Sequence, residues 1–128
     1  MRTLRRILHV DDVPSIQLVT RIALQKLGGY EILSCDSGEQ ALEKVGQFDP
    51  DMILLDLELP HMDGIELLHQ LAGVIDLHNT PVVLLTGQND PVDLSELRDL
   101  GVRRLLSKPF DPLMLAAQLK ETWEAEHE

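Results

Sequence analysis

The sequence predicts an α/β fold, in which a five-stranded parallel sheet carries helices on both faces. Short apolar runs of the kind that form buried strands recur along the chain, and amphipathic helical patterns separate them. Strands and helices alternate strictly through five units, which favours parallel over antiparallel pairing. The predicted strands cover residues 7–10, 30–35, 52–55, 82–85 and 105–107.

The first predicted helix covers residues 14–27, where apolar residues recur at helical spacing until a pair of glycines ends the pattern. The strand at 30–35 follows it directly. The second helix covers residues 37–45 and opens with a capping-box pattern, Ser37 with Gln40 three residues later.

Residues 48–51 form a turn into the strand at 52–55, which is apolar at every position and is therefore expected to be buried on both faces. Asp63 can cap the third helix, which carries four apolar residues at helical spacing. The fourth helix covers residues 92–100 and ends at a glycine. The last helix covers residues 112–124, with proline in its first turn.

Composition limits the class of protein. The 128 residues are enough for one domain, expected over residues 1–128 with its core at 5–124. The formal net charge of −11 repels the phosphate backbone, which argues against direct binding of nucleic acid. Cys35 is the only cysteine, so no internal disulfide forms, and no apolar stretch approaches the ~20 residues of a membrane span. A cytoplasmic protein is therefore expected.

Polar side chains follow four of the predicted strands. Asp11 and Asp12 follow the first strand, Asp56 the third, Thr86 the fourth and Lys108 the fifth. Because the carboxyl ends of parallel strands lie along one edge of the sheet, where ligands bind, we expect these side chains to converge. Three acids, a hydroxyl group and a lysine suit a divalent metal ion together with a phosphoryl group.

The three carboxylates cannot all stay ionised within a few ångströms of each other without a cation, because like charges raise one another's pKa. Mg²⁺ fits this group, since it takes hard oxygen ligands and binds one or two carboxylates together with phosphate oxygens. Ca²⁺ takes more protein oxygens, and Zn²⁺ takes His or Cys. Asp56, at the end of the central strand, is the best candidate to attack phosphorus and form an acyl phosphate, with Lys108 and Thr86 binding the phosphoryl oxygens.

These motifs resemble those of the response-regulator receiver domains of two-component signalling, in their chemotaxis-regulator-like form. The resemblance covers roughly residues 5–123 and implies a doubly wound, flavodoxin-like sheet with strand order 2-1-3-4-5. The segments that carry it are residues 7–12, 51–56, 59–64, 84–87 and 107–110.

The resemblance implies a role for each site residue. Asp56 is the expected phosphoacceptor and a metal ligand, Asp12 binds Mg²⁺ directly, and Asp11 binds it directly or through water. The backbone carbonyl of Glu58 is the remaining protein ligand. Lys108 pairs with the phosphoryl group through its ammonium, and the peptide bond that follows it is expected to be cis.

The resemblance also implies how the protein works. The phosphoryl donor is a phosphohistidine on a sensor histidine kinase or a histidine phosphotransfer protein. Thr86 turns inward to bond the phosphoryl group, which changes a surface that an unknown downstream protein reads. A phosphorylation-dependent homodimer is left open, as is the choice between a stand-alone regulator and part of a longer protein. Enzyme activity is expected only as self-phosphorylation from a phosphodonor and autodephosphorylation.

Some positions depart from the family pattern or modify it. Leu105 occupies the position where relatives often have an aromatic residue that changes rotamer on activation, and Val13 stands where many have a polar residue. Glu58 and Gln88 are expected to set the lifetime of the phosphoryl group by controlling the attacking water. His9 lies inside a predicted strand and is interpreted as a packing or hydrogen-bonded residue rather than a ligand.

Two other functions remain open on the sequence alone. A small aspartate-dependent phosphohydrolase uses a second acid two residues after its nucleophile, where Glu58 stands, but the Asp11–Asp12 pair fits that class poorly and no substrate-recognising cap is present. A phosphorylation-independent interaction module would keep the fold without the chemistry. The intact set of polar residues argues against that alternative.

Overall fold

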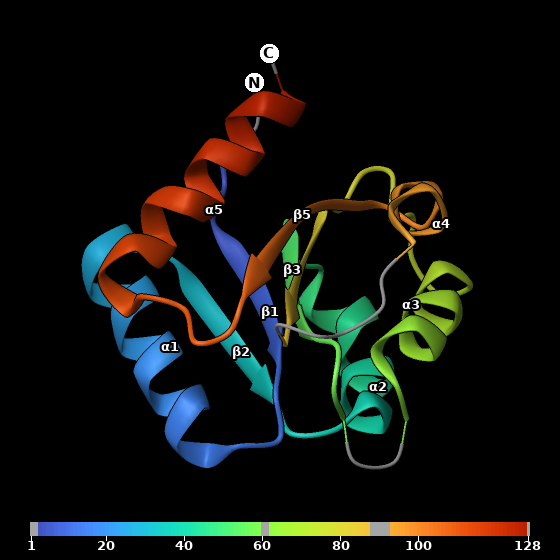
Figure 1. The fold of residues 1–128 in the computed structure, drawn as a ribbon, viewed down its shortest axis with the longest axis horizontal. Helices are drawn as coiled ribbons and strands as arrows, with labels where there is room; N and C mark the ends of the chain where they lie inside the picture. The colour runs from blue at the N-terminus through green and yellow to red at the C-terminus, as the bar shows by residue number, and fades with distance from the viewer. Residues whose placement is uncertain (1–2, 60–61, 88–92, 128) are drawn as a thin grey trace.

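The computed structural model describes residues 3–59, 62–87 and 93–127, and it has one five-stranded sheet (Figure 1). The strand order is β2-β1-β3-β4-β5, and all four neighbouring pairs are parallel, as the sequence predicts. The strands are β1 (Arg6–Val10), β2 (Glu31–Cys35), β3 (Met52–Asp56), β4 (Val82–Thr86) and β5 (Val102–Ser107).

Helices cover both faces of the sheet. In Figure 1, α1 and α5 lie on one side, and α2, α3 and α4 lie on the other. None of the helices within the described residues is both long and apolar enough to cross a membrane. The helices are α1 (Pro14–Gly28), α2 (Gly38–Phe48), α3 (Gly64–Ala72), α4 (Leu94–Asp99) and α5 (Pro112–Glu126).

The sheet divides the interior into two apolar cores, because alternate side chains of a strand point to opposite faces. Leu54 of β3 packs toward α1 and α5, whereas its neighbour Leu55 packs toward α2, α3 and α4. Every residue of β3 and β4 is buried, which confirms the expectation for the apolar strand at 52–55. The fold therefore fixes the carboxyl ends of the two central strands firmly from both sides.

The cap predictions are confirmed at two helices. The Ser37 hydroxyl accepts a hydrogen bond from the backbone N–H of Gln40 at 3.1 Å, and the Asp63 carboxylate accepts one from Glu66 at 2.8 Å. The fourth helix begins at Leu94 in the structure, and the prediction that it starts at residue 92 falls outside the described residues.

The last strand is longer than predicted, because β5 begins at Val102 rather than at residue 105. Arg103 and Arg104 interrupt the apolar pattern there. Both side chains are nevertheless paired, Arg103 with Glu126 at 2.7 Å and Arg104 with the backbone carbonyl of Gln118 at 2.9 Å. Ion pairs and hydrogen bonds to α5 thus allow two charged residues to lie in a half-buried strand.

Asp51 joins the start of β3 to the start of β1. One oxygen of its buried carboxylate accepts hydrogen bonds from the backbone N–H groups of Arg5 at 3.0 Å and Arg6 at 2.9 Å. We expect Asp51→Ala to lower the free energy of unfolding by about 2 kcal/mol, because both N–H groups lose their acceptor. Urea denaturation measures the change.

The matched control is Asp99→Ala at an exposed position of α4, expected to stay within about 0.5 kcal/mol of the wild type. Asp51→Asn should lose less than Asp51→Ala, because the amide oxygen still accepts. An Asp51→Ala protein as stable as the wild type would contradict this account of how β1 is anchored.

Candidate functional site

Three aspartates meet at the carboxyl edge of the sheet, as the strand-end rule predicts. Asp11 and Asp12 follow β1, and Asp56 is the last residue of β3. Each offers a carboxylate oxygen, and these oxygens all lie within 4.8 Å of one another. The Asp11 and Asp56 residues are only 1% and 2% exposed, and Asp12 is the least buried of the three. Two carboxylates are therefore held together almost out of contact with water.

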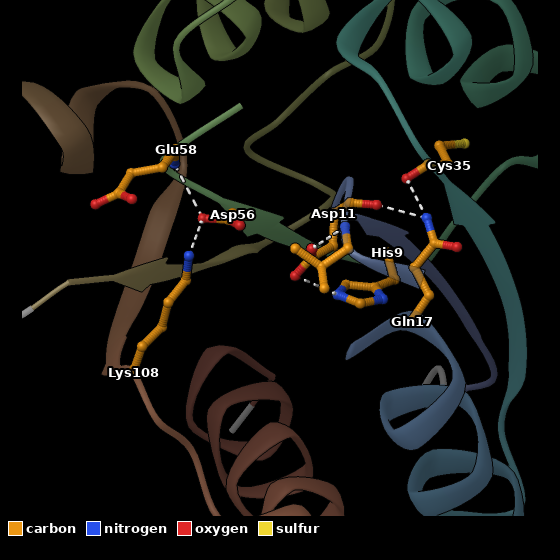
Figure 2. Close-up of polar contacts among 8 residues, drawn as sticks. His9, Asp11, Gln17, Cys35, Asp56, Glu58 and Lys108 are labelled. Atoms are coloured by element: carbon orange, nitrogen blue, oxygen red, sulfur yellow. Dashed lines mark hydrogen bonds and ion pairs between the residues drawn. The ribbon is translucent and has the colours of Figure 1, made fainter. Parts of the chain in front are cut away.

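Asp56 is fixed through one of its two oxygens (Figure 2). Its Oδ1 lies 2.6 Å from the ammonium of Lys108 and accepts a hydrogen bond from the backbone N–H of Glu58 at 2.9 Å. Its Oδ2 accepts no hydrogen bond from the residues that the structure describes. One oxygen is thus anchored, and the other is available for chemistry.

Lys108 responds to the charge of its neighbours. Its partial burial alone would lower the pKa of the ammonium, but the hydrogen bond and the negative charge of Asp56 outweigh burial and raise it. The charges of Glu58 and Asp11 act in the same direction. Lys108 therefore remains a positive charge directed at the carboxylates.

The Asp11 carboxylate is under electrostatic strain. Burial is the largest cause of its raised pKa, and the negative charges of Asp56 and Asp12 add to the shift. A hydrogen bond that Asp11 Oδ1 accepts from the backbone N–H of Val13 at 2.9 Å, and the positive charge of Lys108, oppose it. A bound cation would relieve this strain, since it would stabilise the charged form.

Thr86 and Lys108 are joined through the backbone. Thr86 ends β4, is only 7% exposed and pairs in register with Ser107. The Lys108 N–H donates to the Thr86 carbonyl at 2.8 Å, and the bond from Lys108 to Pro109 is cis, as expected. The structure thus places the hydroxyl-bearing residue on the strand next to the lysine.

The loop after Asp56 is held by a close approach between two backbone segments. The Gly64 N–H donates to the Leu57 carbonyl at 2.9 Å. A Cβ atom at Gly64 would lie 2.9 Å from the Leu57 Cα atom, which is closer than side chains normally come. A glycine at the start of α3 therefore lets that helix fix the backbone directly after Asp56.

The remaining predicted residues lie around this centre. Glu58 contributes its backbone N–H, and its carboxylate extends away from Asp56 (Figure 2). Leu105 is partly buried against the core on the side of α2, α3 and α4. The prediction for Gln88 falls outside the described residues.

A cavity of about 330 Å³ opens beside the carboxylates. Asp56 and Lys108 line it together with apolar side chains, among them Val13 and Phe110. The cavity therefore combines charged and apolar side chains in one lining, as ligand sites usually do.

Sequence reasoning missed Gln17 at this edge and did not connect His9 with Asp11. The side-chain amide of Gln17 donates to the backbone carbonyls of Asp11 and Cys35, and so ties α1 to the ends of β1 and β2. His9 is buried with neither ring nitrogen hydrogen-bonded within the described residues, so it packs, as one of the two predicted alternatives requires, and makes no such bond. Its position two residues before Asp11, on the same face of an extended chain, is the signal that could have drawn attention to it.

The donor set suits Mg²⁺. The three clustered groups are carboxylates, which are hard oxygen ligands, and no His or Cys belongs to this cluster in the described part of the chain. The fold and this edge together define a class of doubly wound α/β domain with an acidic cluster and a lysine at the carboxyl ends of its strands. Comparison with known proteins identifies the family within that class.

The family model of the response regulator receiver domain matches residues 7–120. The chain therefore belongs to the response regulator receiver domain family of two-component phosphorelay signalling. Receiver domains are signalling domains that interact with sensor kinases or phosphotransfer proteins.

Curated relatives support the assignment. The chain is 37% identical over 106 residues to sporulation initiation phosphotransferase F of Bacillus subtilis, covering 83% of each protein. It is also 37% identical over 121 residues to the DNA-binding response regulator MtrA of Mycolicibacterium smegmatis, covering 94% of this chain and 51% of MtrA. The alkaline phosphatase synthesis transcriptional regulatory protein PhoP of Bacillus subtilis is 34% identical, with 91% and 47% covered. The chain thus spans about half the length of MtrA and PhoP.

Solved structures of receiver domains have the same fold as this chain. The chemotaxis protein CheY4 of Vibrio cholerae superposes with a TM-score of 0.83 at 30% identity, over 94% of this chain and 99% of that one. A CheY-like receiver domain protein from Methanospirillum hungatei gives a TM-score of 0.81 at 26% identity, over 98% of each chain.

Proposed function

We propose that this chain is a phosphorylation-controlled switch in which Asp56 accepts a phosphoryl group from a phosphohistidine. The observation that carries the proposal is the asymmetry of Asp56, whose Oδ1 is held by Lys108 and by the backbone of Glu58 while Oδ2 has no donor among the described residues. In the transfer, Oδ2 bonds to phosphorus as the phosphorus–nitrogen bond of the donor breaks. The released imidazole nitrogen takes up a proton.

The proposal includes a Mg²⁺ site. Its ligands would be the carboxylates of Asp11, Asp12 and Asp56 and the backbone carbonyl of Glu58. Bound Mg²⁺ would neutralise part of the charge on the transferring group. The short distances among the carboxylate oxygens and the raised pKa of Asp11 support this part of the proposal.

Lys108 and Thr86 would bind the phosphoryl group on Asp56. The ammonium of Lys108, already 2.6 Å from Asp56, would pair with the new phosphoryl oxygens, and the Thr86 hydroxyl would bond another. Because Thr86 and Lys108 share a backbone hydrogen bond, movement at one would shift the other. The added charge would then bias a two-state equilibrium at the surface of α4, β5 and α5, next to Leu105.

Further parts of the proposal concern lifetime and partners. Glu58 and Gln88 would control the water that hydrolyses the acyl phosphate. The phosphoryl donor would be a sensor histidine kinase or a histidine phosphotransfer protein. A downstream protein would bind the surface that phosphorylation changes. Phosphorylation could also produce a homodimer. We propose that residues 1–128 form one receiver domain that acts in the cytoplasm without binding nucleic acid directly.

The test is incubation with Mg²⁺ and acetyl phosphate, followed by measurement of the intact mass. We expect one phosphoryl adduct on the wild type and none on Asp56→Asn, because the amide is a poor nucleophile. Removal of Mg²⁺ with a chelator should abolish the adduct. No adduct from acetyl phosphate or a cognate kinase would favour an interaction module, and repeated turnover of a phosphomonoester would favour a phosphohydrolase.

A further inference from the structure

His9 is a polar residue where the fold calls for an apolar one. It lies in β1 between Leu54 of β3 and Ser34 of β2, and it is fully buried. Ile7, two residues earlier, points to the same face and packs in the core beneath α1 and α5. A leucine or isoleucine at position 9 would suit this environment.

The free-energy cost of burying the His9 imidazole is not offset by hydrogen bonds to the described residues. Neither Nδ1 nor Nε2 has a hydrogen-bond partner within the described residues. A buried polar group without a partner destabilises a protein relative to an apolar side chain of similar volume. The position of His9 therefore needs an explanation beyond packing.

The carboxylate of Asp11 lies close to the imidazole. Its Oδ2 lies 3.8 Å from His9 Nε2, and Figure 2 shows the ring directed toward it. The other oxygen, Oδ1, is already fixed by the backbone N–H of Val13 at 2.9 Å. Gln17 fixes the Asp11 backbone through its carbonyl. Among the residues that the structure describes, Asp11 Oδ2 thus accepts no hydrogen bond, and the His9 ring faces it.

The ring faces Oδ2 through Nε2. An imidazole with its hydrogen on Nε2 would direct a donor at that oxygen.

We propose that His9 is a positioning residue of the metal site: when Mg²⁺ binds, its Nε2–H closes from 3.8 Å to hydrogen-bond distance of Asp11 Oδ2 and holds the carboxylate in the orientation that binds the ion. The inference rests on the proposed Mg²⁺-dependent function. It follows the general behaviour of metal sites, in which a second layer of hydrogen bonds orients the ligating carboxylates. His9 itself touches neither the metal ion nor the phosphoryl group.

Calorimetric titration with Mg²⁺ tests the proposal on the full chain. We expect His9→Leu to weaken binding about tenfold or more, and His9→Gln, whose amide nitrogen reaches the position of Nε2, to stay within about threefold of the wild type. His9→Asn places its amide near the position of Nδ1 and should resemble His9→Leu. The control is Thr20→Val, which should leave Mg²⁺ affinity unchanged. Thr20 is also fully buried, and its hydroxyl has no hydrogen-bond partner in the described part of the chain.

A measurement on the wild type covers the case in which a variant fails to fold. Nitrogen-15 spectra of the His9 ring should show the Nε2–H tautomer, and its signal should shift when Mg²⁺ is added. The Nδ1–H tautomer, wild-type affinity in His9→Leu, or equal rescue by Gln and Asn would each overturn the proposal.

The outcomes also separate this inference from the proposed function. If the wild type accepts a phosphoryl group with Mg²⁺ but the His9 variants bind Mg²⁺ normally, only the role of His9 fails. If Mg²⁺ binding depends on His9 but no adduct forms, the proposed function fails and this inference stands. A wild type that does not bind Mg²⁺ overturns both.

Discussion

Replacing Lys108 by methionine is expected to slow phosphorylation by acetyl phosphate about 100-fold. The ammonium lies 2.6 Å from Asp56 Oδ1, where negative charge would gather in the proposed transfer. Removal of one well-placed group that stabilises such charge typically costs about 10²–10³ in rate. Methionine keeps most of the length and packing of the side chain, so the variant isolates the charge. The initial rate of adduct formation, measured by intact mass, gives the factor.

The matched control is the same change at Lys120. That lysine is 68% exposed and pairs with Glu124 in α5, away from the carboxylates. Acetyl phosphate should phosphorylate Lys120→Met at the wild-type rate. If Lys108→Met were phosphorylated as fast as this control, the Lys108 ammonium would not assist the transfer.

Gly64→Ala is expected to lower the free energy of unfolding by about 3 kcal/mol, the upper end of the usual cost of overpacking. The new methyl group would meet the backbone of Leu57 at 2.9 Å and the carbonyl oxygen of Asp56 at 3.2 Å. Backbone cannot rotate out of the way as a flexible side chain can. We also expect slower phosphorylation, because relief of the clash would shift the end of β3, where Asp56 lies, and the backbone that follows it. Urea denaturation and the labelling rate measure the two effects.

Gly46→Ala provides the control for a glycine-to-alanine change in a helix. Gly46 lies exposed in α2, and a Cβ atom there would meet nothing within 4 Å. This variant should gain roughly 0.5–1 kcal/mol, because alanine is the better helix former. If both variants gained stability, the close approach at Gly64 would not constrain the fold.

Much of the fold follows from patterns that act over a few residues. The apolar strands and the caps at Ser37 and Asp63 depend on local sequence, and each agrees with the structure. The start of β5 does not follow in this way, because Arg103 and Arg104 are compatible with a strand only through partners 23 and 14 residues further along the chain. Contacts between residues so far apart in the sequence cannot be predicted from the apolar pattern of the strand itself.

The candidate site divides in the same way. Convergence of the three aspartates and Lys108 follows from the rule that parallel strands end at one edge. Which oxygen of Asp56 is held, and which side chain faces Asp11 Oδ2, depend on differences of about an ångström that no spacing rule contains. These finer details are the ones that distinguish the Asp56 oxygen that is held from the one that accepts no hydrogen bond within the described residues.

The arginines of β5 also protect the sheet from unwanted growth. An edge strand presents unpaired backbone groups to which another chain can add, a route to aggregation. Here Arg103 and Arg104 lie in an edge strand and are tied to α5, and the pairing of β5 with β4 is irregular near Val82. A strand from another molecule that paired with β5 would have to break these contacts with α5 and bury two guanidinium groups. The two arginines that interrupt the apolar pattern of β5 thus also make this strand a poor template for aggregation.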